Sequence, residues 1–316
     1  MVGSARRLYW LSLGLGALGL VATVLALVTA LSAVSLVPPP VAALVALCQR
    51  FLLPDLSAGA VVVLALAGLG LAVLFLGARA VLRQVAAHRR FGRELRVGGE
   101  VEVAGSRVVL LEDPRPRAFC AGFLRPRIYL STGARDALSG DELGAVIAHE
   151  RHHLARRDPL RTSLARTLGE ALFFVPILRR VAERYTDLAE LAADEAAVRE
   201  RGAPALASAL LSFGGRGPST VAVGITPERA DHLLGERGPR WELPALALIG
   251  SLVAVGAVIA LGLQLALTAD ETLNLATLVM QSCMLAMAAL PVLVLASAVF
   301  YSKALRGVRT RLPQYQ

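Results

Sequence analysis

The stretch LGAVIAHERHHLARRD, residues 143–158, contains three of the five histidines in the chain. Two of them, His149 and His153, are four residues apart, so a helix would direct both imidazoles from one face. This spacing suits two nitrogen ligands of one zinc ion, and it places Glu150 where a general base can act on a zinc-activated water. We therefore interpret Glu150 as the catalytic residue of a hydrolytic zinc site with one zinc per chain.

A catalytic zinc needs a third protein ligand and one open position. In zincins of the His₂Glu type this ligand is a carboxylate on a later helix, and Glu190 and Asp194 offer one at helical spacing on one face. We expect Glu190 to bind the metal and Asp194 to accept a proton from the remote nitrogen of a ligand histidine. Asp187 and Asp194 remain alternative ligands. His152 is expected beside the ligands, in a supporting or surface position.

The segment around this motif, residues 79–242, predicts a domain in which strands precede helices. Four runs rich in Val, Ile and aromatic residues, bounded by Gly, Pro and Asp, are typical of strands: 100–103, 107–111, 119–123 and 127–130. Ser139 and Glu142 have the spacing of a capping box and predict a helix that ends near Arg157. Further helices are expected over 160–174, from 177 to just before Gly202, and over 203–212. The expected domain is therefore α+β.

The composition excludes an ordinary soluble enzyme and a disordered chain. Hydrophobic residues make up 55% and charged residues 18% of the chain, against about 45–50% and about 25% in soluble domains. Four charge-free stretches are long enough to cross a bilayer as helices: 8–37, 56–78, 243–269 and 272–302. The first is too long for the apolar region of a signal peptide. We expect two transmembrane helices within 1–78 and two within 243–302.

Basic residues near these stretches indicate how the chain is oriented. They gather at the N-terminus, in 79–96, in 229–240 and in the basic tail 303–316, whereas the opposite side of the predicted membrane carries only Arg50. Basic residues favour the cytoplasmic side. Both termini and the domain 79–242 are therefore expected in the cytoplasm, in a multi-pass protein of the cell (plasma) membrane. Arginines close to such a membrane face more often contact anionic lipid than nucleic acid, so no direct nucleic-acid binding is expected.

Three motifs together resemble a known family. HERHH at 149–153, RRD at 156–158 and ELAADEA at 190–196 resemble the integral-membrane zinc metallopeptidases of the BlaR/MecR type. Residues 118–130 resemble the strand pair that precedes the motif helix in that family, and the four-span layout also fits. The resemblance implies a zincin-like (gluzincin) domain inserted between spans two and three. The chain lacks a segment resembling the C-terminal penicillin-binding domain of the family's sensors, so direct β-lactam sensing is not expected.

The resemblance also implies an activity and a binding surface. The chain would be a cytoplasm-facing endopeptidase that relays a signal by cutting itself, a DNA-bound repressor of the BlaI/MecI winged-helix type, or both. Its extended substrate would pair with an edge strand formed by Phe119, Cys120, Ala121 and Gly122. For the oxyanion, the donors offered by spacing alone are Arg229, His232 and Tyr185, and the sequence does not choose among them.

Two other functions remain open. The first is a quality-control or processing protease resembling the HtpX or CAAX-protease group, which shares the His-Glu-x-x-His and Glu-x-x-x-Asp motifs. The second is a non-enzymatic membrane receptor or scaffold with structural zinc. A purely structural site has no use for Glu150, so the protease hypothesis is preferred. The stimulus, the cleavage site and the oligomeric state cannot be read from the sequence.

Overall fold

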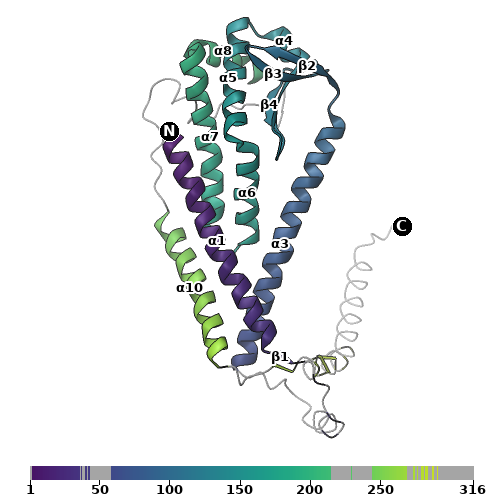
Figure 1. Ribbon diagram of the computed structural model, residues 1–316, viewed down its shortest axis with the longest axis vertical. Coiled ribbons are helices and arrows are strands. Elements are labelled where there is room, and N and C mark those ends of the chain that lie inside the picture. The colour runs from purple at the N-terminus through teal and green to yellow at the C-terminus, as the bar shows by residue number, and fades with distance from the viewer. Residues whose placement is uncertain are drawn as a thin grey trace, which may run out of the picture. The chain divides into compact units, whose positions relative to one another are not determined.

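The computed structural model describes residues 2–35, 58–214, Arg229 and 244–268, with isolated positions within 37–42 and 273–290 (Figure 1). The chain divides into two compact units. The first comprises Met1–Val24 and Leu69–Ile259, and the second comprises Leu25–Gly68 and Ala260–Gln316. The second unit contains a short parallel pairing of β1 (Val34–Ser35) with β6 (Leu273–Asn274). All the features of the candidate site belong to the first unit.

Three helices in the described part of the chain are long and apolar enough to cross a membrane. They are α1 (Val2–Ser32), α3 (Ala58–Glu94) and α10 (Ala245–Leu267). They correspond to the first three predicted spans. The fourth, 272–302, falls almost wholly outside the described residues. The helix α3 continues well beyond the predicted end of its span at Ala78, because charged residues such as Arg79 end an apolar segment without ending a helix.

The domain contains a small mixed sheet in the order β2-β3-β5-β4. Its strands are β2 (Val97–Val103), β3 (Ser106–Leu111), β4 (Ala118–Ala121) and β5 (Arg127–Ser131). The strands β3 and β5 are parallel, and the other two neighbouring pairs are antiparallel. Ala104 and Gly105 connect β2 to β3 with φ values of 47° and 70°, as a two-residue hairpin turn requires. All four predicted strands are therefore present, and β4 lies at one edge.

Between the sheet and Gly214, the structure has five helices: α4 (Thr132–Ala137), α5 (Gly140–Arg156), α6 (Asp158–Ala171), α7 (Pro176–Arg201) and α8 (Ala203–Gly214). The predicted capping box is present at the start of α5: the backbone N–H of Ser139 donates to Glu142 Oε2 at 2.7 Å, and the Glu142 N–H donates to Ser139 Oγ. Arg157 adopts a left-handed conformation that ends α5. Because Pro159 suits the first turn of a helix, α6 starts at Asp158, earlier than the sequence predicts.

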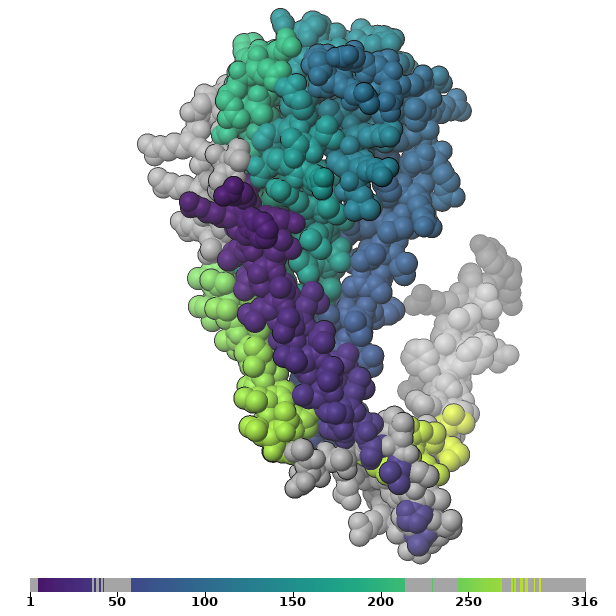
Figure 2. Space-filling view, in the orientation of Figure 1, coloured from purple at the N-terminus to yellow at the C-terminus, as the bar shows by residue number. Residues whose placement is uncertain are grey.

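The core lies on both sides of α5. Val146 and Ile147 of this helix pack with Val108, Ile128 and Leu130 of the sheet. Small residues on its other side, among them Ala145 and Ala148, pack against α7 and α8. Figure 2 shows the blue atoms of the sheet and the teal and green atoms of α5 to α8 as one continuous mass. Helix α5 is thus held rigidly between two layers, which fixes the directions of its histidines.

The start of α4 supplies a test of this packing. A Cβ at Gly133 would lie 2.1 Å from the carbonyl oxygen of Pro114. That carbonyl has little room to move, because Ser131 Oγ donates to the Arg115 carbonyl at 2.7 Å. We expect Gly133→Ala to destabilise the domain by about 3 kcal/mol, and to lower its melting temperature in detergent by roughly 5 °C or more. Gly140→Ala is the control, since a Cβ there meets nothing within 4 Å, and an equal loss in both variants would contradict the prediction.

Candidate metal centre

Helices α5 and α7 bring three potential ligands together. The Nε2 atoms of His149 and His153 lie 3.2 Å apart. The two Glu190 carboxylate oxygens lie 3.5 Å from these atoms, Oε2 from His149 and Oε1 from His153. The potential ligand atoms of these three residues all lie within 4.8 Å of one another. The structure therefore brings together the ligand set that the sequence offered first.

This arrangement fits a tetrahedral zinc ion. Zinc–nitrogen bonds of about 2.0–2.1 Å at tetrahedral angles separate two ligand nitrogens by roughly 3.3 Å. The distances of 3.2, 3.5 and 3.5 Å between the three groups are close to that value. Two imidazole nitrogens that face each other at this distance in a buried site need a cation or a proton between them. The donor set of two nitrogens and one carboxylate is also one of those found in catalytic zinc sites.

His149 and His153 each have a carboxylate close to Nδ1, the ring nitrogen that faces away from the potential metal site. Asp194 Oδ1 lies 3.0 Å from His149 Nδ1, and Asp158 Oδ2 lies 2.9 Å from His153 Nδ1. A carboxylate at Nδ1 keeps the proton there and leaves the Nε2 lone pair free for a metal. The structure thus places Asp194 beside a histidine Nδ1, and its role in orienting a metal ligand stays a prediction. The sequence did not predict the contact of Asp158 with His153. Pro159 marks the start of a new helix at this point, and that helix start places the Asp158 carboxylate beside His153.

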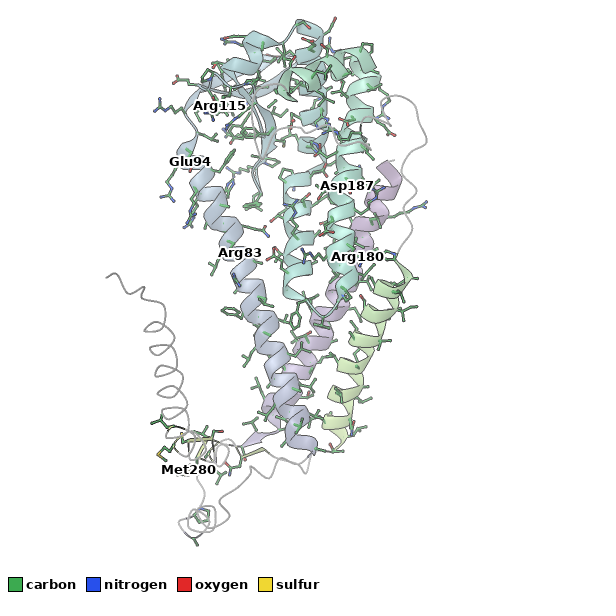
Figure 3. The ribbon with its side chains drawn as sticks, turned by 180° about the vertical axis from the view of Figure 1, so that it is seen from behind. Arg83, Glu94, Arg115, Arg180, Asp187 and Met280 are labelled. Atoms are coloured by element: carbon green, nitrogen blue, oxygen red, sulfur yellow. The ribbon has the colours of Figure 1, made fainter. Side chains whose placement is uncertain are left out.

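The alternatives to Glu190 as ligand lie elsewhere in the site. Asp194 contacts His149 Nδ1 through its Oδ1. Asp187 Oδ2 lies 3.5 Å from Arg184 Nη1. Figure 3 shows Asp187 on α7, and its side chain contributes to the wall of the cavity described below. His152 lies beside the potential ligands, with its ring centroid 6.4 Å from that of His153. Burial, together with the charge of Arg156, lowers the pKa of His152 to about 4.

The three oxyanion candidates have different surroundings. The Arg229 guanidinium is buried and donates twice to Asp194, from Nε and from Nη2, at 2.7 Å each. Its Nη1 also lies 3.5 Å from Glu190. The Tyr185 hydroxyl donates to Asp158 Oδ1 at 2.7 Å, behind His153. His232 lies outside the described residues. The geometry thus gives Arg229 and Tyr185 supporting contacts to the carboxylates, contacts that spacing in the sequence could not reveal.

Burial and charge alter the protonation of this cluster. Burial alone would lower the pKa of His149, but its contacts with Asp194 and Glu190 outweigh burial and raise this pKa to about 10. Burial likewise tends to raise the pKa values of Glu190 and Asp194. Contacts with His149 outweigh burial at both residues, and Asp194 also contacts Arg229. These contacts hold the pKa of each carboxyl at about 2. The site is therefore anionic enough to hold a proton between its groups, and by the same field it attracts a metal cation.

Glu150 differs from the other carboxyls of the site. It is only 4% exposed, and this burial raises its pKa above the ordinary value, although the nearby His149 and His153 act in the opposite direction. The backbone N–H of Cys120 in β4 donates to its carboxylate. Burial and the charges of Glu150 and Asp158 raise the pKa of the Cys120 thiol to about 12, so this cysteine stays protonated. Glu150 is thus held between the histidines and the edge strand.

A cavity of about 850 Å³ adjoins the site. Its walls come from α3, the strand β4 with Gly122 and Phe123, and α5, α6 and α7. Phe91 of α3 lies edge-on to Phe119 of β4, with 5.2 Å between ring centroids. Farther along α3, Arg83, labelled in Figure 3, pairs with Glu170 of α6. The predicted edge strand therefore borders the cavity that contains the three potential ligands.

Comparison with known proteins places the chain in a family. Residues 57–237, more than half of the chain, match the family model described as BlaR1 peptidase M56. The chain belongs to this family. It is also 33% identical over 128 residues to a "Protease HtpX homolog" of Acidiphilium cryptum (strain JF-5). That match covers 37% of this chain and 44% of the relative, so the chain spans less than half of the relative's length. No solved structure matches the chain.

The protonation of the site predicts how zinc binding to this member of the BlaR1 peptidase family would depend on pH. Because the pKa of His149 is raised to about 10, a proton must leave it when a metal binds at neutral pH. Lowering the pH strengthens the competing proton, so we expect the apparent zinc affinity to fall about tenfold per pH unit for each proton displaced. Chelator competition at pH 6, 7 and 8 measures this slope. An affinity that does not change over this range would contradict the protonation of His149.

Proposed function

We propose that the chain is a membrane-embedded zinc metalloendopeptidase with a cytoplasm-facing active site. One observation carries the proposal: two imidazole nitrogens and a carboxylate converge beside the buried Glu150 at the wall of a cavity. His149, His153 and Glu190 would hold one zinc ion. When bound, zinc supplies Lewis-acid activation of a water and of the peptide carbonyl.

The residues of the chain supply the proton transfers and the orientation. Glu150 accepts the proton of the attacking water and passes it to the leaving amine. The raised pKa of Glu150 is closer to neutral pH than that of an ordinary carboxyl, and a group that acts as both general base and general acid works best when its pKa lies near the working pH. Asp194 and Asp158 hold the ligand histidines in the tautomer that leaves Nε2 free. A purely structural zinc site would need no buried acid at position 150, which disfavours a receptor or scaffold without activity.

The substrate is proposed to bind as an extended strand along β4. The segment 119–122 lies in or directly after an edge strand and borders the cavity. An extended peptide can add to such an edge through main-chain hydrogen bonds. Phe119, stacked on Tyr129 with ring centroids 5.3 Å apart, offers an apolar surface to a substrate side chain. Glu150, which accepts from the Cys120 N–H, lies beside the same strand.

The physiological role proposed is signal transduction by proteolysis. Membership of the BlaR1 peptidase family supports it, and the substrates would be the chain itself, a winged-helix repressor of the BlaI/MecI type, or both. The alternative is a quality-control or processing protease, which the similarity to a protease HtpX homolog favours. A broad set of cleaved membrane proteins would indicate this alternative.

The proposed topology retains four transmembrane helices and an inserted gluzincin-like domain. Three apolar helices support the first three spans, and the mixed sheet followed by helices supports the domain within 79–242. The proposal adds the span 272–302, the cytoplasmic tail 303–316 and insertion in the plasma membrane. Labelling of single cysteines introduced near each terminus tests the orientation in intact cells.

The activity is tested in membranes that contain either the wild-type chain or Glu150→Gln at matched zinc content. Immunoblots follow cleavage of the chain itself and of a co-expressed winged-helix repressor. Products formed only by the wild type support a protease and identify a substrate. If neither is cut, a broad peptide library presented to the zinc-loaded full chain decides: cleavage supports the protease but removes the repressor as substrate, and no cleavage contradicts the activity.

A further inference from the structure

Asp158 connects the site to a second polar side chain. Its Oδ2 lies 2.9 Å from His153 Nδ1, and its Oδ1 accepts from the Tyr185 hydroxyl at 2.7 Å. Asp158 is 4% exposed and Tyr185 is 1% exposed. Because the side chain is buried and each carboxylate oxygen has its own partner, the carboxylate is fixed in rotation. The orientation of the His153 imidazole therefore depends on Tyr185 through Asp158.

Tyr185 in turn packs against the first apolar helix. The ring of Tyr9 in α1 lies 5.6 Å from the ring of Tyr185, measured between centroids. Arg161 of α6 lies over the ring of Tyr9, with its Cζ 5.2 Å from the ring centroid. The contact between α1 and α6 continues at Gly16, where a Cβ would come within 2.8 Å of Leu168. Because α1 packs this closely, a sideways movement of α1 would change its contacts with α6 and α7.

The other ligand histidine is held differently. Asp194, which lies 3.0 Å from His149 Nδ1, receives two hydrogen bonds from Arg229 at 2.7 Å. Arg229 belongs to the segment between α8 and α10, and Asp194 belongs to α7. The two histidines thus have separate supports, and the support of His153 is the one that contacts α1 through an aromatic ring.

We infer that Asp158 and Tyr185 are positioning residues for His153, and that Tyr9 makes this positioning depend on the first membrane helix. The inference rests on the proposed function, since it assigns the regulation of the same metal site. A shift or rotation of α1 removes the Tyr9 ring from Tyr185, and the hydroxyl then no longer fixes Asp158. His153 becomes free to rotate, and the site loses affinity for zinc and its geometry for catalysis.

The test measures zinc affinity of the full chain in lipid nanodiscs by chelator competition. Tyr185→Phe removes only the hydroxyl, and we expect zinc to bind about tenfold more weakly, the lower end of the effect usual for partners of ligand histidines. Asp158→Asn is the second variant and should weaken binding at least as much. At saturating zinc, both should lower kcat more than they change KM, because both residues act through the orientation of His153. Melting temperatures identify any variant that is not folded.

The contribution of α1 is tested with substitutions at Tyr9. Tyr9→Leu should weaken zinc binding severalfold, whereas Tyr9→Phe keeps the ring and should bind as the wild type does. Val21→Ala is the control, since Val21 lies on the same helix α1 and is 56% exposed. Equal zinc affinity in the wild type, Tyr185→Phe and Asp158→Asn would overturn the positioning role. Equal affinity in Tyr9→Leu and Val21→Ala would overturn the coupling to α1. A wild-type chain that binds no zinc would instead contradict the proposed function itself.

Discussion

Glu150→Gln is expected to abolish peptide cleavage while the chain still binds zinc. Glutamine has the size of glutamate, but its amide cannot take a proton from the attacking water. Glu150 is buried and is not one of the three residues whose ligand atoms converge, so the metal site should survive the change. Loss of a general base lowers the rate about 100- to 10,000-fold. Initial rates on a cleaved peptide, with zinc content measured on the same samples, give the comparison.

An exposed glutamate serves as the matched control for this variant. Glu183 lies on α7, is 66% exposed at its side chain and pairs with Arg179 at 3.3 Å. Glu183→Gln makes the same chemical change away from the site and should leave the rate within about twofold of the wild type, since exposed ion pairs contribute little. If Glu150→Gln retains a comparable rate with zinc bound, another residue is the base and the assignment of Glu150 is wrong.

Glu190→Gln is expected to cause the second large effect, on metal binding. The carboxylate lies 3.5 Å from both histidine Nε2 atoms, and a neutral amide is a much poorer ligand for zinc. If three ligands share a binding free energy on the order of 10–16 kcal/mol equally, loss of one weakens zinc binding by about 300- to 8,000-fold. Titration with a chromophoric chelator measures the affinity, and the wild type should bind one zinc per chain.

The neighbouring acid Asp187 separates the two possible ligands. Asp187 also lines the cavity but lies near Arg184 and outside the converging set. Asp187→Asn should therefore keep the wild-type zinc affinity. Tight zinc binding by Glu190→Gln together with loss of zinc by Asp187→Asn would mean that the ligand is Asp187. That result would leave His149 and His153 in place but would change which face of α7 turns toward the metal.

Local structural features could be predicted from the sequence because they depend on spacing within one helix or strand. The capping box at Ser139 and Glu142 is present as predicted, and all four predicted strands form. The three apolar helices that the structure describes coincide with the predicted stretches, since their length and composition are one-dimensional properties. The errors at their ends are also local in origin. A charged residue such as Arg79 ends an apolar stretch, but the helix α3 continues to Glu94.

The sequence by itself determined that His149 and His153 share one helical face, because the helical period leaves no other choice for an i, i+4 pair. Apart from Asp194, which the sequence already offered, only the tertiary structure decided which groups lie behind these two histidines. Asp158 reaches His153 through a one-residue break between helices, and Tyr185 joins it from 27 residues away. Arg229 reaches Asp194 from 35 residues away. Such partners depend on how helices pack side by side, and no spacing along the chain encodes that distance.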